Sequence, residues 1–429
     1  MKNEIFQDTR LLDAMDYIDS AIIAETADKL RPPVSPERKR ENKKNNNFFF
    51  ACRQAAALVA CALLMGAVIP AVSLLIGNIR PTGNAGANPP AQESEPEVSD
   101  EETSIQNTVY EGSKGLEYVI NSDGKSASFI GFGTCTDEDI VIASSYNGFP
   151  VTEMINDKRN SGVPLEEAGS LYAKSITVSD TVKSISAGIF ESCSNLESIY
   201  IGANVNFIRS FKTNTQNLSA LAEIVVSEDN KYFSDNGNCL IEIQSKTIIA
   251  ACKKSFIPDD GSVEIIGASA FRNYPQKELT IPEGIKRIEN SAFFESNLEY
   301  VQLPSSLEYL GNSVFAECKE LQSADLNGFT QLPNVTFGCC GKLTSIKGIE
   351  KVTYIGDDAF IACISLKELS LGSGLTEIGE EAFALIVSMD TLNYAGTVEE
   401  WNAIKKGENW NNMLFSIKYI NCSDGKATP

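Results

Sequence analysis

The chain has 429 residues, more than one ordinary compact domain needs, and 43% of them are hydrophobic, which is enough for a substantial core. Its formal net charge of -21 is unevenly spread, because the part after residue 77 alone carries a balance of -22. Such an acidic body would repel nucleic acid, since affinity for phosphates comes from Lys and Arg. The sequence contains no histidine, which removes the commonest general base and the commonest metal ligand.

The cysteines and the missing motifs limit the chemistry further. Eleven cysteines are present, an odd number that cannot all pair within one molecule. The sequence has no Cys-x-x-Cys pair, no Gly-x-Ser-x-Gly elbow and no phosphate-binding loop. Gly131-Phe132-Gly133 is only a fragment of a nucleotide-binding fingerprint. We therefore expect no enzyme, no cofactor and no metal site; a catalytic pair of carboxylates is the remaining alternative.

The first segment, residues 1–54, combines an amphipathic helix with a basic linker. Within residues 5–30, one helical face carries Leu11, Met15, Ile18 and Ile22. The stretch LLDAMDYIDSAIIAE is similar to the short cytosolic heads of some Firmicutes membrane proteins that resemble anti-sigma factors. That resemblance implies a docking helix for a cytosolic partner such as a sigma factor; a short helix with no partner is the alternative.

Residues 55–77 form an uncharged run of 23 residues, AAALVACALLMGAVIPAVSLLIG, which predicts a transmembrane helix. Six basic residues between positions 38 and 53 precede it, whereas acidic residues dominate after Arg80. The positive-inside rule then places the N-terminus in the cytoplasm and the rest of the chain outside a single-pass membrane protein. A cleavable signal peptide is the alternative, but its apolar region would be shorter and nearer the N-terminus. The match of Leu58–Cys61 to a lipoprotein box is interpreted as chance, because the apolar run continues past Cys61.

Residues 78–111 are expected to form a disordered, acidic stalk. Positions 81–107 are rich in Pro, Gly, Ser and acidic residues and almost lack large apolar side chains. Such a composition cannot bury enough surface to offset the entropy of ordering. The stalk would hold the following body away from the membrane.

Residues 112–391 carry an internal repeat. Phenylalanines recur every 22 or 23 residues, at Phe271, Phe293, Phe315, Phe337, Phe360 and Phe383. A Gly-x-x-Ala-Phe phrase often ends at these phenylalanines, and a Leu-x-x-Φ-x-Φ pattern follows, in which Φ is an apolar residue. The alternation at the end of this pattern predicts a short strand with one buried face. A period of 20–29 residues is typical of leucine-rich-repeat solenoids. We predict an α/β, β-rich leucine-rich-repeat solenoid.

The repeat phrase is similar to BspA-type leucine-rich repeats of bacterial surface proteins, most clearly in residues 279–303. Residues 130–154 resemble that family's opening strands, 232–252 its hairpin interruption, and 392–410 its C-terminal closing module. The resemblance implies a cell-surface adhesion protein. The chain departs from the pattern at Ser296, where cysteine is expected, and after Phe271, where Gln276 or Lys277 replaces the usual leucine. Residues 155–184 and 202–223 are irregular, which leaves the number of coils there open.

The closing module, residues 392–429, has its own signals. Thr397 and Glu400 form a capping box that begins a short helix, and we expect Gly407 to end it. Trp401 and Trp410 are expected in the core of the cap rather than in contact with a ligand.

Three cysteines of the repeats share one register and should stack between successive coils: Cys318, Cys340 and Cys363. Buried cysteine behaves as a small apolar residue, so free thiols are favoured. A disulfide between neighbouring coils is the alternative.

A ligand would be expected on the exposed face of the strand ladder. The outward positions predicted from the repeat register, with two neighbours, are Tyr200, Thr280, Tyr300, Gln302, Asp325, Lys347, Glu368 and Ser370. This mixed polar set suits an extracellular protein or glycan better than nucleic acid. A solvated surface, a transmembrane signalling regulator and a structural surface component remain alternatives.

Overall fold

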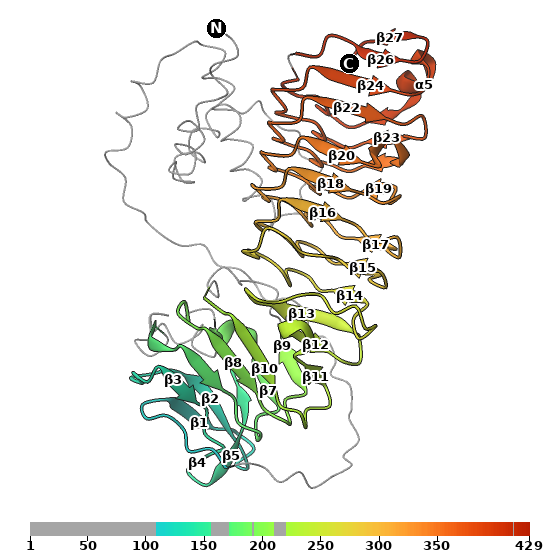
Figure 1. Cartoon of the computed structure of the whole chain (residues 1–429). Coiled ribbons are helices and arrows are strands. Elements are labelled where there is room, and N and C mark those ends of the chain that lie inside the picture. The colour runs from blue at the N-terminus through green and yellow to red at the C-terminus, as the bar shows by residue number, and fades with distance from the viewer. Residues whose placement is uncertain (1–108, 156–170, 191–192, 210–219, 415) are drawn as a thin grey trace, which may run out of the picture.

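A computed structural model of the protein describes residues 109–155, 171–190, 193–209, 220–414 and 416–429. The expected cytosolic segment, the expected membrane helix at 55–77 and most of the expected stalk lie outside these ranges. Within the described ranges, no helix has the length and apolar character to cross a membrane. They form a β-solenoid whose coils stack from the N-terminal sheets to a C-terminal cap (Figure 1).

Most regular coils of the C-terminal half supply one strand to each of two parallel ladders. The first ladder contains β16 (Tyr300–Gln302), β18 (Ser323–Asp325), β20 (Ser345–Lys347), β22 (Glu368–Leu371), β24 (Thr391–Tyr394) and β26 (Ile420–Cys422). The second contains β13 (Thr247–Ala251), β14 (Ile265–Ile266), β15 (Arg287–Ile288), β17 (Tyr309–Leu310), β19 (Gln331–Leu332), β21 (Tyr354–Ile355), β23 (Glu377–Ile378) and β25 (Lys405–Lys406). The predicted Leu-x-x-Φ-x-Φ strands from Leu298 to Leu371 are those of β16 to β22 in the first ladder, whereas the one at 196–201 lies in the N-terminal part and 279–281 forms no strand.

Each ladder has one break, and each break coincides with a change of residue. In the second ladder, Gly311 N donates to Ile288 O at 2.8 Å and Gly356 N to Leu332 O at 2.7 Å. Pro333 is the corresponding residue directly after β19. It has no N–H to donate to the preceding coil, and β17 and β19 do not pair. In the first ladder, Gly348 stands where neighbouring coils have leucine, and the 3-10 turn η7 (Ile349–Lys351) follows it between β20 and β22.

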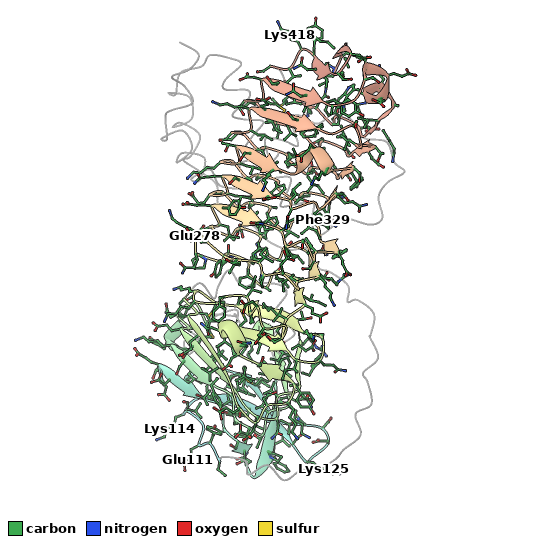
Figure 2. The ribbon with its side chains drawn as sticks, turned by 45° about the vertical axis from the view of Figure 1, so that its right-hand side comes forward. Glu111, Lys114, Lys125, Glu278, Phe329 and Lys418 are labelled. Carbon is green, nitrogen blue, oxygen red and sulfur yellow. The ribbon has the colours of Figure 1, made fainter. Side chains whose placement is uncertain are left out.

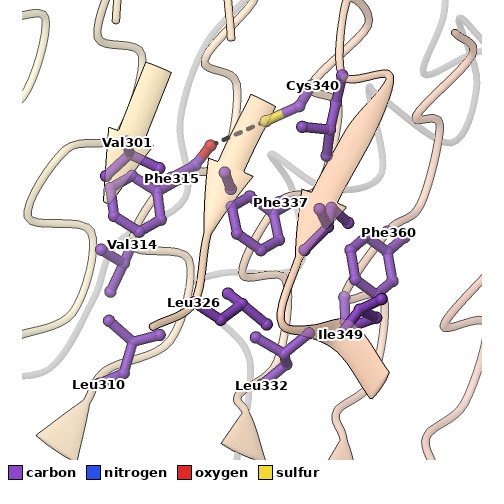
Figure 3. Packing of buried hydrophobic residues seen from close by; sticks show 14 of the residues in the cluster. Val301, Leu310, Val314, Phe315, Leu326, Leu332, Phe337, Cys340, Ile349 and Phe360 are labelled. Atoms are coloured by element: carbon purple, nitrogen blue, oxygen red, sulfur yellow. Dashed lines mark hydrogen bonds between the residues drawn. The ribbon is translucent and has the colours of Figure 1, made fainter. Parts of the chain in front are cut away.

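The third side of each coil is the turn that carries phenylalanine. The six repeat phenylalanines are fully buried, and neighbouring rings lie 5.3–5.8 Å apart between centroids at interplanar angles of 9–28° (Figure 3). The turns also bond directly, as where Phe315 N donates to Thr336 O at 3.0 Å. The prediction of a stacked 22–23-residue repeat is confirmed.

The repeat cysteines add a further row of bonds between coils. Cys318 Sγ lies 3.1 Å from Phe293 O, and Cys363 Sγ lies 3.1 Å from Phe337 O. Cys340 Sγ lies 3.1 Å from Phe315 O, the contact drawn in Figure 3. These cysteines are free, and each thiol donates to the carbonyl of the preceding coil. Burial raises the pKa of Cys363 to about 12, so the thiol stays protonated. Ser296 Oγ takes the corresponding position one coil earlier, 3.1 Å from Cys318 Sγ.

The N-terminal part is built from two further sheets. One has the order β1 (Glu117–Ile120), β2 (Ala127–Gly131), β5 (Phe149–Met154), β7 (Ser184–Ser186) and β9 (Phe207–Arg209), with β4 (Ser145–Tyr146) paired to β5. The other has the order β10 (Glu223–Val226), β8 (Ser198–Ile201), β6 (Ser175–Thr177) and β3 (Asp139–Val141), and η4 (Ala187–Phe190) lies between β7 and β8. The sequence left the number of coils open in residues 155–184 and 202–223. The structure places β6 and the start of β7 in the first stretch and β9 in the second.

Residues 232–252 separate the two halves. They contain β11 (Phe233–Ser234), η6 (Asn236–Asn238), β12 (Cys239–Glu242) and β13, and the pairs β11–β12 and β12–β13 are antiparallel. Leu240 and Ala250 belong to the N-terminal hydrophobic core, whereas Ile241 and Ile248 belong to the C-terminal one. Leu240 and Ile241, which are neighbours on β12, thus face two different cores, as strand alternation requires.

The C-terminal cap closes the last coil. Helix α5 (Val398–Ala403) begins with the predicted capping box, in which Thr397 and Glu400 exchange side-chain and backbone hydrogen bonds. The predicted end at Gly407 is wrong, because the helix ends at Ala403 and the chain then joins the second ladder as β25. Gly407 instead permits a close approach, since a Cβ there would lie 2.3 Å from Glu380 N. The hairpin of β26 and β27 (Gly425–Ala427) completes the cap.

Both tryptophans lie in the core of this cap, as predicted. Trp401 and Trp410 are 1% and 7% exposed, and their rings lie 5.7 Å apart. Trp410 also meets the last ring of the phenylalanine row, Phe383, edge to face at 6.1 Å.

Candidate ligand-binding face

The outward side chains of the first ladder form the candidate surface, which we call the ladder face, in two runs (β16 to β20 and β22 to β26) on either side of the break at Gly348. Its eleven residues are Tyr300, Gln302, Ser323, Asp325, Ser345, Lys347, Glu368, Ser370, Thr391, Asn393 and Asn421. They alternate with buried residues such as Val301 and Ile346, so strand periodicity alone turns them away from the core. In Figure 2, Glu278 lies near the middle of the solenoid, shortly before the first strand of the ladder in the sequence, and Lys418 lies at its C-terminal end.

Tyr300 is the large aromatic side chain of the ladder face. It is 46% exposed, and its hydroxyl lies 3.4 Å from Gln302 Oε1 on the same strand. The strands register Gln302 against Asp325 and Asp325 against Lys347, so three predicted residues do lie in one row.

Asp325 was expected to be open to solvent, but its side chain is largely buried. Its side chain is 7% exposed, while that of Lys347, which pairs with it at 2.7 Å, is 81% exposed. Asn327 N also donates to its carboxylate at 2.9 Å. The hydrogen bond from Lys347 is the main cause that lowers the pKa of Asp325. Asp325 therefore positions Lys347, and only Lys347 can meet a ligand directly.

The C-terminal half of the ladder face is a network of amides and hydroxyls. Asn393 Nδ2 donates to Glu368 Oε1 at 3.0 Å and to Ser370 Oγ at 3.2 Å, and Asn421 Nδ2 donates to Asn393 Oδ1 at 3.0 Å. Glu368 and Ser370 were predicted, whereas Asn393 and Asn421 were missed. Their segment was assigned wholly to the cap, although Leu392-Asn393-Tyr394 continues the strand alternation.

Two predicted residues lie away from this network. Thr280 is exposed one coil before β16, but its segment forms no strand. Tyr200 lies on β8 in the N-terminal sheet, half-buried, and the β11–β13 insertion separates it from the ladder face. The structure thus brings six of the eight predicted residues onto one ladder.

The chemistry available on the ladder face is hydrogen bonding from amide, hydroxyl and phenol groups, together with one ion pair. Within the described ranges, no three His, Cys, Asp or Glu side chains are grouped so that they could hold a metal ion.

The repeats themselves identify the family. Residues 168–241, 242–347 and 264–390 match the BspA type leucine rich repeat region, in six copies that span more than half of the chain. The chain belongs to the BspA-type leucine-rich-repeat family. In this BspA-type protein, the ladder face and the phenylalanine row are two sides of the same repeat.

Solved structures of other repeat proteins are similar to this BspA-type chain. A leucine-rich repeat protein from Eubacterium ventriosum is 18% identical with a TM-score of 0.42, covering 72% of this chain and 91% of that one. A leucine rich cell surface protein from Faecalibacterium prausnitzii is 19% identical with a TM-score of 0.36, covering 70% and 98%. A leucine-rich repeat protein from Bacteroides ovatus is 18% identical with a TM-score of 0.33, covering 72% and 93%. No curated protein matches the chain.

Proposed function

We propose that this chain is a membrane-anchored cell-surface protein whose solenoid binds an extracellular protein or glycan through the ladder face. Membership of the BspA-type family supports a binding role for the repeat body. The observation that carries the proposal is the ladder face itself, where strands in register present polar side chains outward over successive coils. Such a surface gives a partner many weak contacts rather than one deep pocket.

The proposed location rests on the sequence before the solenoid. The uncharged run at 55–77, the basic residues before it and the acidic residues after it support an anchor with the repeat body outside. The acidic segment that follows would let the solenoid reach beyond the membrane surface.

A binding assay with matched variants tests the proposal. The purified full-length protein in detergent is applied to immobilised host-matrix proteins and to intact bacterial cells. Tyr300→Ala and Lys347→Glu change the ladder face, whereas Tyr309→Ala changes an exposed tyrosine of the second ladder and serves as the control. We expect binding that falls about tenfold in the first two variants, a loss of about 1.4 kcal/mol, and no change in the control. A folded wild-type protein that binds none of these surfaces would overturn the proposal.

A second candidate function is transmembrane signalling, favoured by the apolar helical face in residues 5–30. In that case the solenoid senses a ligand and the cytosolic helix docks a partner. A pull-down with residues 1–50 distinguishes the two functions. Specific capture of a sigma factor would promote signalling, and an empty pull-down from a lysate that contains the factor would remove it.

A further inference from the structure

The ladder face is almost neutral although the chain carries a net charge of -21. Of its eleven outward side chains, eight are uncharged and polar. Lys347 is paired with Asp325 at 2.7 Å, and Glu368 accepts a hydrogen bond from Asn393. The face therefore carries three charged side chains, two of them paired with each other, and a net charge of about -1.

Ion pairs bridge successive coils along the second ladder, on another side of the same coils. Glu264 accepts from both Lys246 and Lys286 at 2.7 Å, and Glu377 pairs with Lys405 at its far end. Arg287 stacks 4.1 Å above the ring of Tyr309. Lys277–Glu299 and Lys342–Glu320 are likewise ion pairs next to the first ladder. The low charge therefore belongs to the outward strand positions of the ladder face and not to that whole side of the coils.

The ladder face is also periodic. Parallel strands repeat at about 4.8 Å, and most coils place two outward side chains on the ladder. This spacing is close to the length of one pyranose ring in an extended polysaccharide. Hydroxyl and amide groups both donate and accept hydrogen bonds, which is also the chemistry of sugar hydroxyls. Tyr300, at the end where the ladder begins, offers an exposed ring against which a sugar can stack.

We propose that the ladder face binds a neutral, extended polysaccharide that runs along the solenoid axis with about one sugar unit per coil. This inference rests on the proposed function and chooses between its two classes of partner. A protein partner would be expected to meet a cluster of aromatic and arginine anchors. The ladder face instead has one tyrosine and a row of small polar residues.

The test uses the full-length protein in detergent and titrates it with defined glycans. The neutral probes are xyloglucan, mannan and a β-glucan, with oligosaccharides of increasing length from the one that binds; the anionic probes are alginate and hyaluronan. We expect a neutral probe to bind with an affinity that rises with length up to about six sugar units, one for each strand of the ladder. That affinity should be the same at low salt and at about 0.5 M sodium chloride, because a neutral glycan forms no ion pair with the protein that salt could screen.

Three variants locate the binding. Tyr300→Ala should weaken it about tenfold by removing the stacking ring, and Ser345→Glu should weaken it similarly by placing a charge in the middle of the row. Tyr309→Ala on the second ladder should leave it unchanged. Circular dichroism of each variant confirms that the solenoid is folded.

The outcomes separate this inference from the function on which it rests. Preference for an anionic probe, binding that weakens with salt, or indifference to Tyr300→Ala and Ser345→Glu would overturn it. So would equal binding to intact cells before and after periodate oxidation of their glycans, although surface binding itself would then stand. Failure to bind either the glycans or any cell or protein surface would overturn both.

Discussion

Replacing Phe337 with alanine should strongly destabilise the C-terminal half of the solenoid. Phe337 is 1% exposed and stacks between Phe315 and Phe360, at 5.7 and 5.8 Å between ring centroids. Removing a buried ring leaves a cavity that rigid neighbouring coils cannot fill, which costs about 3–5 kcal/mol. Phe337→Leu keeps most of the apolar volume and loses mainly the two ring contacts, so we expect about 1–2 kcal/mol.

Tryptophan fluorescence during urea unfolding measures this effect selectively. The only two tryptophans, Trp401 and Trp410, lie in the cap and belong to the same buried cluster as Phe337. Phe129→Ala is the control, because Phe129 lies in the other core, beyond the β12–β13 hairpin. It should shift a circular-dichroism transition and leave the fluorescence midpoint in place. A urea midpoint of Phe337→Ala equal to that of the wild type would refute the claim that the stacked phenylalanines stabilise the C-terminal coils.

Three further changes follow from contacts between coils. Cys340→Ala should cost about 1 kcal/mol in thermal unfolding because Phe315 O loses the thiol donor and keeps the longer bond from Cys318 N at 3.4 Å, whereas Cys340→Ser retains a donor and should lie near wild type. Gly379→Ala should destabilise by more than the usual effect of an added methyl, since its Cβ would lie 2.4 Å from Asp357 N, and a wild-type melting temperature would contradict the close approach. Two lysines hold the pKa of Glu264 at about 2, below its ordinary value of 4.5, so its contribution is present above pH 4.5 and is lost as the pH falls toward 2. Urea midpoints between pH 6 and about 2.5 should fall less steeply in Glu264→Gln than in wild type.

The regular coils could be predicted from the sequence because each rule is local. The spacing of the phenylalanines fixes the coil length, and strand alternation fixes which residues face outward. The capping box at Thr397 likewise depends on a few neighbouring residues.

The rest depends on contacts between coils that the spacing does not encode. Asp325 is outward in register, yet its side chain is only 7% exposed and pairs with Lys347 from the next strand. The helix in the cap ends earlier than Gly407 because strand pairing with β23 takes over the chain. Asn393 and Asn421 join the ladder face only because the cap continues the first ladder instead of ending it.

Protease shaving of intact cells tests the central claim, an extracellular solenoid, most directly. Proteinase K is added to living cells, and antibodies against the repeat body and against residues 1–50 follow the two parts of the chain. The proposed topology predicts that the repeat body is released or degraded while the N-terminal epitope stays protected until the membrane is permeabilised. A repeat body that survives in intact cells and disappears only after permeabilisation would contradict the account, because no extracellular partner could then reach the ladder face.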